Sequence, residues 1–168
     1  MDVFPVDMPE DGGPISLRSC PIKTDKVAFS VYSFQPWQAL SMHRHTNSDE
    51  VFYVVGGRCL FYVGSETRPV GPGHAVYVPS GAGHAVLSCE KGATLLSVQG
   101  PRPVTSIYGN LEYFCPACGL ETPLPEGTAT GDVTRCPRCK TAVRLAETGA
   151  AFDAEPATAG RPDEARAL

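Results

Sequence analysis

Three histidines and a glutamate occur in this sequence at spacings that suit a metal site. His43 and His45 are separated by one residue, Glu50 follows shortly after them, and His84 comes after a segment rich in Gly and Pro. On an extended strand, residues i and i+2 project from the same face, so both early histidines can point into one interior. Imidazole and carboxylate ligands together suit Fe(II), Mn, Ni, Cu or Zn, and a site with open positions can bind substrate or dioxygen. The alternative is that these histidines are incidental, but among the 4 histidines of the chain only His74 fits no ligand position.

Four cysteines form a second cluster of candidate ligands, in the pairs Cys115/Cys118 and Cys136/Cys139. Two Cys-x-x-Cys turns supply four thiolates in tetrahedral geometry, which is the arrangement of a structural zinc ribbon. Iron in a rubredoxin-like site uses the same ligands. A closed four-thiolate site has no open position, so we expect it to stabilise the fold. A disulfide framework and a redox Cys-x-x-Cys are the alternatives, although two pairs are present and neither has a βαβ context.

Short β-rich runs surround the histidines and must position them. These runs are Val27–Phe34, Glu50–Val55, Arg58–Val63, Ala75–Val78, His84–Cys89 and Thr94–Val98. They are separated by Gly, Pro, Ser or Asn, which is typical of an all-β sandwich or barrel, and no stretch has convincing helical periodicity. Gly56-Gly57 lies between two runs and predicts a tight hairpin turn, because both positions tolerate positive φ.

The patterns divide the chain into four parts. We expect an N-terminal arm at 1–20, a β-barrel at 21–110, a four-cysteine zinc ribbon at 111–146 and a disordered tail at 147–168. The tail is dominated by Ala, Glu, Asp, Pro, Thr and Gly, and offers almost no apolar anchor.

Composition excludes several classes of function. The net charge is −4 and no basic patch stands out, so we expect no nucleic-acid partner. No apolar run approaches the roughly 18 to 20 residues that span a bilayer, and the N-terminus lacks the layout of a signal peptide. We therefore expect a cytoplasmic protein without a membrane partner. Exposed edge strands give a physical reason to pair, so we also expect a homodimer.

The histidine segments resemble the two signature motifs of the cupin superfamily, whose fold is a small β-barrel or jelly roll. The matching residues are His43, His45, Glu50 and Gly57 in the first motif, and Gly73, Pro79, Gly81 and His84 in the second. The leading Gly of the first motif is absent, and Ser88 stands where the family often has Asn. The resemblance implies that His43, His45, Glu50 and His84 are the ligands of one metal ion.

A cupin followed by two Cys-x-x-Cys pairs resembles bacterial 3-hydroxyanthranilate 3,4-dioxygenases, which are Fe(II) ring-cleaving enzymes with a C-terminal rubredoxin-like site. The local matches are Glu50–Tyr53, Arg102-Pro103, Leu111–Gly119 and Arg135–Pro137. The resemblance implies an iron triad of His43, Glu50 and His84, with His45 as an extra ligand or a neighbour.

The residues that would recognise that family's substrate are missing. Ala39 and Ser88 stand where the family has two arginines, which removes bidentate recognition of a carboxylate. Gln99 falls on the position of the family's pocket glutamate, and an amide cannot act as a general base.

We therefore expect a mononuclear metal-dependent oxygenase, with Fe(II) favoured, that acts on a small organic substrate other than 3-hydroxyanthranilate. Gln99, Tyr53 and Arg102 are the candidate polar contacts near the reaction. One alternative is a zinc-dependent, non-oxidative cupin that catalyses an isomerisation or rearrangement, including N–N bond formation. A non-catalytic, metal-dependent binding module is the other.

Overall fold

The computed structural model describes residues 1–6, 17–109, 111–148 and 151–157, and this part of the chain contains β-strands and no helix. The all-β prediction is therefore confirmed. The strands, in chain order, are β1 (Leu17–Lys23), β2 (Ala28–Phe34), β3 (Ala39–His45), β4 (Asp49–Val63), β5 (Glu66–Val70), β6 (Ala75–Val78), β7 (His84–Gly100), β8 (Ser106–Tyr108), β9 (Glu112–Phe114), β10 (Glu121–Pro123), β11 (Val133–Arg135), β12 (Ala142–Thr148) and β13 (Ala151–Pro156).

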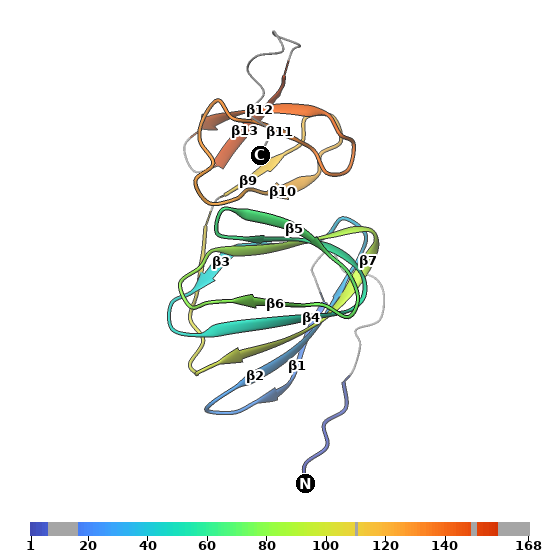
Figure 1. Ribbon diagram of the computed structural model, residues 1–168, viewed down its shortest axis with the longest axis vertical. Coiled ribbons are helices and arrows are strands. Elements are labelled where there is room, and N and C mark those ends of the chain that lie inside the picture. Colours follow the sequence, from blue (N-terminus) through green and yellow to red (C-terminus); the bar gives the residue numbers. More distant parts are fainter. Residues whose placement is uncertain (7–16, 110, 149–150, 158–168) are drawn as a thin grey trace.

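Strands β1 to β8 form the barrel in the lower part of Figure 1. The order β1-β2-β7-β3-β8 makes one path of hydrogen-bonded strands, and β4 pairs with β5, β6 and β7. β4 and β7 are the longest strands, and they pair antiparallel along most of their length. Because β7 also pairs with β2 at one end and β3 at the other, it joins the two halves of the barrel.

The predicted hairpin at Gly56-Gly57 is wrong, because both glycines lie within the single strand β4. The β4–β7 register shifts on either side of Gly57, which has a φ of 77°. A Cβ at Gly57 would overlap the carbonyl oxygen of Gly92 on β7. The glycine therefore permits a bulge at which the two strands approach closely, and bulges of this kind bend a strand around a barrel.

Alternate residues of the central strands face the barrel interior. On β4, Glu50, Phe52 and Val54 are buried, whereas Val51 and Tyr53 are more than two-fifths exposed. The interior is filled mainly by one cluster of apolar side chains, formed by Tyr32, Phe34, Phe52, Val54, Cys59, Phe61, Val78, Val86, Ala93 and Leu95. This cluster leaves Glu50 in a polar region beside it, so the fold itself separates the packed core from the site.

Strands β9 to β13 form a second sheet that covers the end of the barrel near β5 (Figure 1). A second core cluster joins the two sheets. It combines Met42, Tyr62, Ala85 and Leu87 of the barrel with Tyr113, Cys115, Leu120, Leu124, Cys136, Val143 and Leu145 of the C-terminal unit. The barrel and the C-terminal unit therefore share one buried core, and they do not pack as two independent domains.

Glu126 ties the C-terminal unit to the segment that precedes His84. Its backbone N–H donates to Gly64 O at 2.8 Å, and its carboxylate Oε1 accepts from Gly83 N–H at 3.1 Å. Gly64 N–H in turn donates to Gly83 O at 2.8 Å. These three bonds fix the backbone next to a predicted metal ligand.

The chain ends differ from the predicted arm and tail. Leu17–Lys23 pairs with β2, so the predicted arm at 1–20 is too long, and residues 7–16 lie outside the described residues. Ala151–Pro156 forms β13, which pairs with β12, so disorder was wrongly predicted for this segment. Residues 149–150 and 158–168 lie outside the described residues. A search of the described residues for a helix able to cross a membrane finds none.

Candidate metal centre

Three strands of the barrel bring the predicted ligands together. His43 on β3 is the register partner of His84 on β7, and Glu50 on β4 is the partner of Gln99 on β7. All four predicted ligands are buried, with 5% or less of their surface exposed. One ligand atom from each of His43, His45, Glu50 and His84 lies within 4.8 Å of the others.

Each imidazole is held by a contact to its Nδ1 atom. His43 Nδ1 lies 2.8 Å from Ser41 O, and His84 Nδ1 lies 3.2 Å from Ala82 O. A carbonyl oxygen only accepts hydrogen bonds, so both Nδ1 atoms must carry a proton. His45 Nδ1 lies 3.1 Å from the hydroxyl of Ser106. Contacts of this kind orient the histidine ligands of metal sites and leave Nε2 free for the ion.

The Nε2 atoms face the carboxylate of Glu50. His45 Nε2 is 3.0 Å and His84 Nε2 is 3.2 Å from the same oxygen, Oε2. Burial alone would raise the pKa of Glu50, but hydrogen bonds from the two imidazoles outweigh it and hold this pKa well below its usual range. Burial, followed by the neighbouring His84, lowers the pKa of His43 to about 4. Two imidazoles and the Glu50 carboxylate therefore meet at one point, where a metal ion would replace the protons of these hydrogen bonds.

A metal ion fits this point. Two ligand atoms at about 2.1 Å from an ion and at right angles to each other are about 3.0 Å apart. The separations of 3.0 and 3.2 Å between Nε2 and Oε2 agree with this value. Oε1 of Glu50 is buried and makes no hydrogen bond within the described part of the chain, which leaves it available to the same ion. The structure thus contains a possible metal site of three histidines and one glutamate.

A cavity of about 510 Å³ lies over the site. Both histidines of β3 line it, together with polar, aromatic, apolar and cationic side chains. The full lining is Arg18, Cys20, Lys23, Tyr32, Leu40, His43, His45, Gln99, Arg102, Val104, Ser106 and Tyr108. The Tyr108 ring stacks on the His43 imidazole, with centroids 5.4 Å apart. The cavity is large enough for a small organic molecule.

The structure places Gln99 and Arg102 in the lining of this cavity, and Tyr53 elsewhere. Gln99 is 4% exposed, and its side-chain amide lies 2.8 Å from His45 Nε2, so it reaches the metal centre. Tyr53 was wrongly predicted to lie nearby. It is 44% exposed on the outer face of β4, because it lies an odd number of positions after inward-facing Glu50, and successive side chains of a strand point to opposite faces.

Several residues of the site were missed by the sequence reasoning. Ser106 and Tyr108 belong to β8, which pairs with β3 opposite His45 and His43. Arg18 belongs to β1, where its register partner is Tyr32. The sequence signal for β8 is the alternation of side-chain direction along a strand, because Ser106 and Tyr108 lie two positions apart and both face the site. A strand of 3 residues is too short for this pattern to stand out in a sequence.

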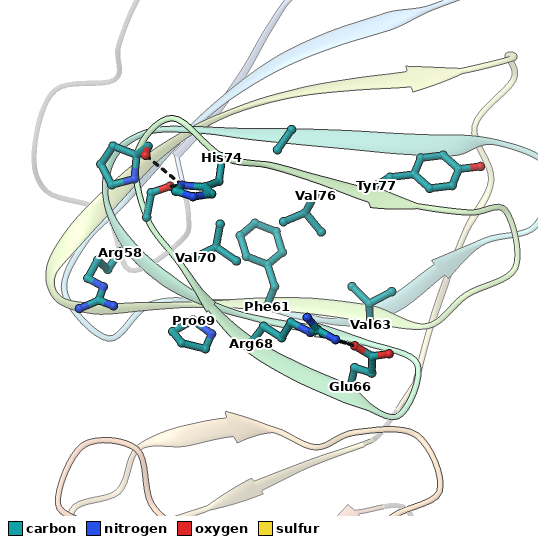
Figure 2. A pocket seen from close by; sticks show the side chains of 13 residues that line it. Arg58, Phe61, Val63, Glu66, Arg68, Pro69, Val70, His74, Val76 and Tyr77 are labelled. Carbon is teal, nitrogen blue, oxygen red and sulfur yellow. Dashed lines mark hydrogen bonds and ion pairs between the residues drawn. The ribbon is translucent and has the colours of Figure 1, made fainter.

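A larger hollow of about 830 Å³ lies elsewhere on the barrel and has different chemistry (Figure 2). Its apolar side chains include Phe61 and Val76, and the Glu66 and Arg68 side chains that flank them pair with each other at 2.7 Å. His74 borders it and contacts backbone carbonyl oxygens, so it takes no part in the metal centre, as expected. None of the four predicted barrel ligands lines this hollow.

The four cysteines lie together in the C-terminal unit. Cys115 Sγ is 3.5 Å from Cys139 Sγ, and Cys118 Sγ is 3.7 Å from Cys136 Sγ. Bonds of about 2.3 Å in a tetrahedral zinc site place sulfur atoms about 3.8 Å apart. The described residues thus hold a second possible metal site, and its cysteines are free thiols and not disulfides.

The two cysteine turns have the same backbone conformation. Gly119 N–H donates to Cys115 O at 2.8 Å, and Lys140 N–H donates to Cys136 O at 2.9 Å. The residue after each second cysteine has positive φ, 70° at Gly119 and 63° at Lys140. This repetition indicates two matched knuckles around one centre. Burial raises the pKa of Cys136 to about 12, so a cation is needed to keep this thiol ionised.

Comparison with known proteins agrees with the barrel and its motifs. The cupin domain family matches residues 30–98. An uncharacterized protein of Streptomyces coelicolor is 42% identical over 80 residues, which are 48% of this chain and 75% of that protein. The crystal structure of TT1209 from Thermus thermophilus is similar with 31% identity and a TM-score of 0.53, covering 55% of this chain and 89% of the other. Residues 30–98 of this chain therefore belong to the cupin domain family.

A further solved structure is similar in fold alone. KdgF from a Halomonas species has 23% identity and a TM-score of 0.51, over 56% of this chain and 86% of its own. The fold prediction of a cupin followed by a four-cysteine unit is thus confirmed.

Proposed function

We propose that this protein is a mononuclear metal-dependent oxygenase that acts on a small organic substrate. The observation that carries the proposal is the convergence of three imidazoles and the Glu50 carboxylate, with ligand atoms within 4.8 Å of one another, beneath an accessible cavity. Fe(II) in such a site would supply open positions for a substrate and dioxygen. An ion held by these four residues would be reached by a substrate through the cavity.

The side chains around the ion would position the substrate. Gln99 would donate a hydrogen bond from its amide, since it has no group that can take up a proton at neutral pH. Tyr108, stacked on His43, would form one wall for a flat ligand. Neither Ala39 nor Ser88 lines the cavity, and Ser88 accepts from Gln38 N–H at 2.9 Å. These positions support a substrate other than 3-hydroxyanthranilate.

One feature favours a second candidate, a zinc-dependent cupin that catalyses a non-oxidative rearrangement. Many non-haem Fe(II) oxygenases use two histidines and one carboxylate, whereas His45 adds a third imidazole here. Zinc in the same ligands would act as a Lewis acid.

Metal analysis separates the two candidates. We expect about two metal ions per chain, with zinc or iron in the cysteine site and Fe(II) in the barrel. After anaerobic loading with iron, the oxygenase proposal predicts dioxygen uptake with a suitable substrate. Zinc in both sites, and product formation without dioxygen, would favour the second candidate. Less than one metal per chain, without recovery on reconstitution, would overturn both.

A further inference from the structure

We infer that the cavity over the metal centre selects substrates with a carboxylate, and that Arg18, Lys23 and Arg102 bind this group. The inference rests on the proposed function in one respect: the end of the substrate opposite the carboxylate binds the metal. The three cations come from β1 and from the segment between β7 and β8, and not from the β3 and β7 positions occupied by Ala39 and Ser88.

The charge of the cavity is one-sided. Three of its lining residues are Arg or Lys, and none is Asp or Glu. The carboxylate beneath the floor is Glu50, which is 1% exposed and committed to the imidazoles. Within the described part of the chain, neither arginine nor Lys23 forms an ion pair with a carboxylate. The cavity therefore holds positive charge that a bound anion would neutralise, and a divalent ion below would add to it.

Arg18 is oriented for this task by contacts that involve no carboxylate. Its Nε and Nη2 atoms donate to Ser30 Oγ at 3.1 and 3.0 Å, and Ser30 is fully buried. The guanidinium carbon lies 5.8 Å from the centre of the Tyr32 ring. A guanidinium has five N–H donors, so donors remain for a ligand while the side chain is held in place. A planar fork held in this way recognises a carboxylate better than a mobile ammonium group.

The shape of the cavity indicates where the two ends of the ligand lie. The imidazoles of His43 and His45 form the floor, whereas Arg18 and Lys23 are exposed at the mouth. Arg102, half-buried, lines the same opening. A ligand with metal-binding oxygens at one end and a carboxylate at the other would satisfy both regions. The aromatic rings of Tyr32 and Tyr108 in the lining suit a flat skeleton between the two ends.

The test compares two probes that differ only in charge, 3,4-dihydroxybenzoate and 3,4-dihydroxybenzamide. Both carry the same pair of metal-binding oxygens. Dissociation constants are measured on the full-length protein loaded with Co(II), from the visible absorption of the ion. Because charge-assisted hydrogen bonds are about twice as strong as neutral ones, we expect the acid to bind at least about tenfold more tightly than the amide.

Variants test whether the cationic side chains cause the preference for the acid over the amide. In Arg18→Gln/Arg102→Gln we expect the acid and the amide to bind within about threefold of each other, with unchanged cobalt content. Arg58→Gln is the matched control, because Arg58 lines the other hollow, and it should keep the wild-type preference. If loss of the Ser30 contacts prevents folding, Lys23→Gln/Arg102→Gln carries the same test.

The outcomes separate this inference from the proposed function. Failure of the barrel to take up cobalt would overturn the metal centre itself. Cobalt uptake with equal affinity for the two probes would overturn the inference and leave the metal centre intact. A preference that persists in both double variants would also overturn it, because the cations would then not be its cause.

Discussion

The metal centre makes a quantitative prediction for the variant His84→Gln. Glutamine is close in size to histidine, so the variant fills the buried position while it removes the imidazole whose Nε2 lies 3.2 Å from Glu50 Oε2. Loss of a group that only orients a metal ligand lowers affinity by about 10- to 100-fold, and loss of the ligand itself should cost at least as much.

The expected size follows from the linkage between metal binding and folding. At a free metal concentration of 100 times the wild-type dissociation constant, binding stabilises the folded protein by about 2.7 kcal/mol. For a chain of this size, that is a rise of about 5–11 °C in Tm. If affinity falls 100-fold, the same concentration gives only about 0.4 kcal/mol, a rise of about 1–2 °C.

Thermal unfolding is followed by fluorescence, with and without Fe(II) or Co(II) under anaerobic conditions. The protein carries zinc in the cysteine site beforehand, so that added metal reports the barrel alone. His74→Gln is the control, because His74 is exposed and contacts only backbone carbonyl oxygens. A His84→Gln variant with the full wild-type shift would refute the assignment of His84 as a ligand.

Four further predictions concern the rest of the molecule. The fold lowers the pKa of His43 to about 4, so below pH 6.5 the unfolded chain takes up a proton that the metal-free folded protein does not. Lowering the pH from about 6.5 to 4 should therefore reduce the free energy of unfolding, by roughly 3 kcal/mol at most. Cys136→Ser should lose the metal of the cysteine site and lower Tm, since Cys136 is fully buried in the core that joins the two sheets. Glu126→Ala should weaken metal binding in the barrel several-fold with unchanged zinc content, because it frees Gly83 N–H beside a ligand. The expected homodimer should sediment with twice the chain mass of 17.9 kDa.

Each of these predictions has a control or a contradicting result. Urea unfolding of His43→Asn should lack part of the loss between pH 6.5 and 4, and an unchanged pH profile would contradict the assignment. Cys20→Ser should keep wild-type metal content, since Cys20 lies outside the cluster. Equal barrel affinity in Glu126→Ala and wild type, measured by competition with a chelator, would show that the contact does not position the ligand. A mass of one chain at micromolar concentration would contradict the dimer.

The metal ligands could be predicted from the sequence because their spacing follows directly from strand geometry. His43 and His45 lie two positions apart on β3, and the alternation of a strand places both on one face. The cysteine pairs were equally clear, because a knuckle is a local structure of a few residues. Both predictions depended on short-range geometry, which the order of residues determines.

The bend of the barrel and the rim of the cavity could not be predicted in the same way. Gly57 looks like a hairpin residue until Gly92 is placed against it, and that contact joins residues distant in sequence. Arg18 lies in a region without clear periodicity, and its role depends on Ser30 and Tyr32 across the β1–β2 pairing. The outward position of Tyr53 was predictable, since it shares the parity of Val51 and opposes that of Glu50.

The contact of Glu126 with Gly83 has a consequence for the order in which the protein acquires its metals. Glu126 lies in the loop between the two cysteine pairs, and it holds the backbone next to His84. We expect the loop, and with it this contact, to be held less firmly in a chain whose cysteines are empty. We expect loading to be sequential, with the cysteine site filled before the barrel. In cells short of zinc, the protein would then accumulate with an empty barrel site, so the proposed activity would follow the supply of a metal that takes no part in its chemistry.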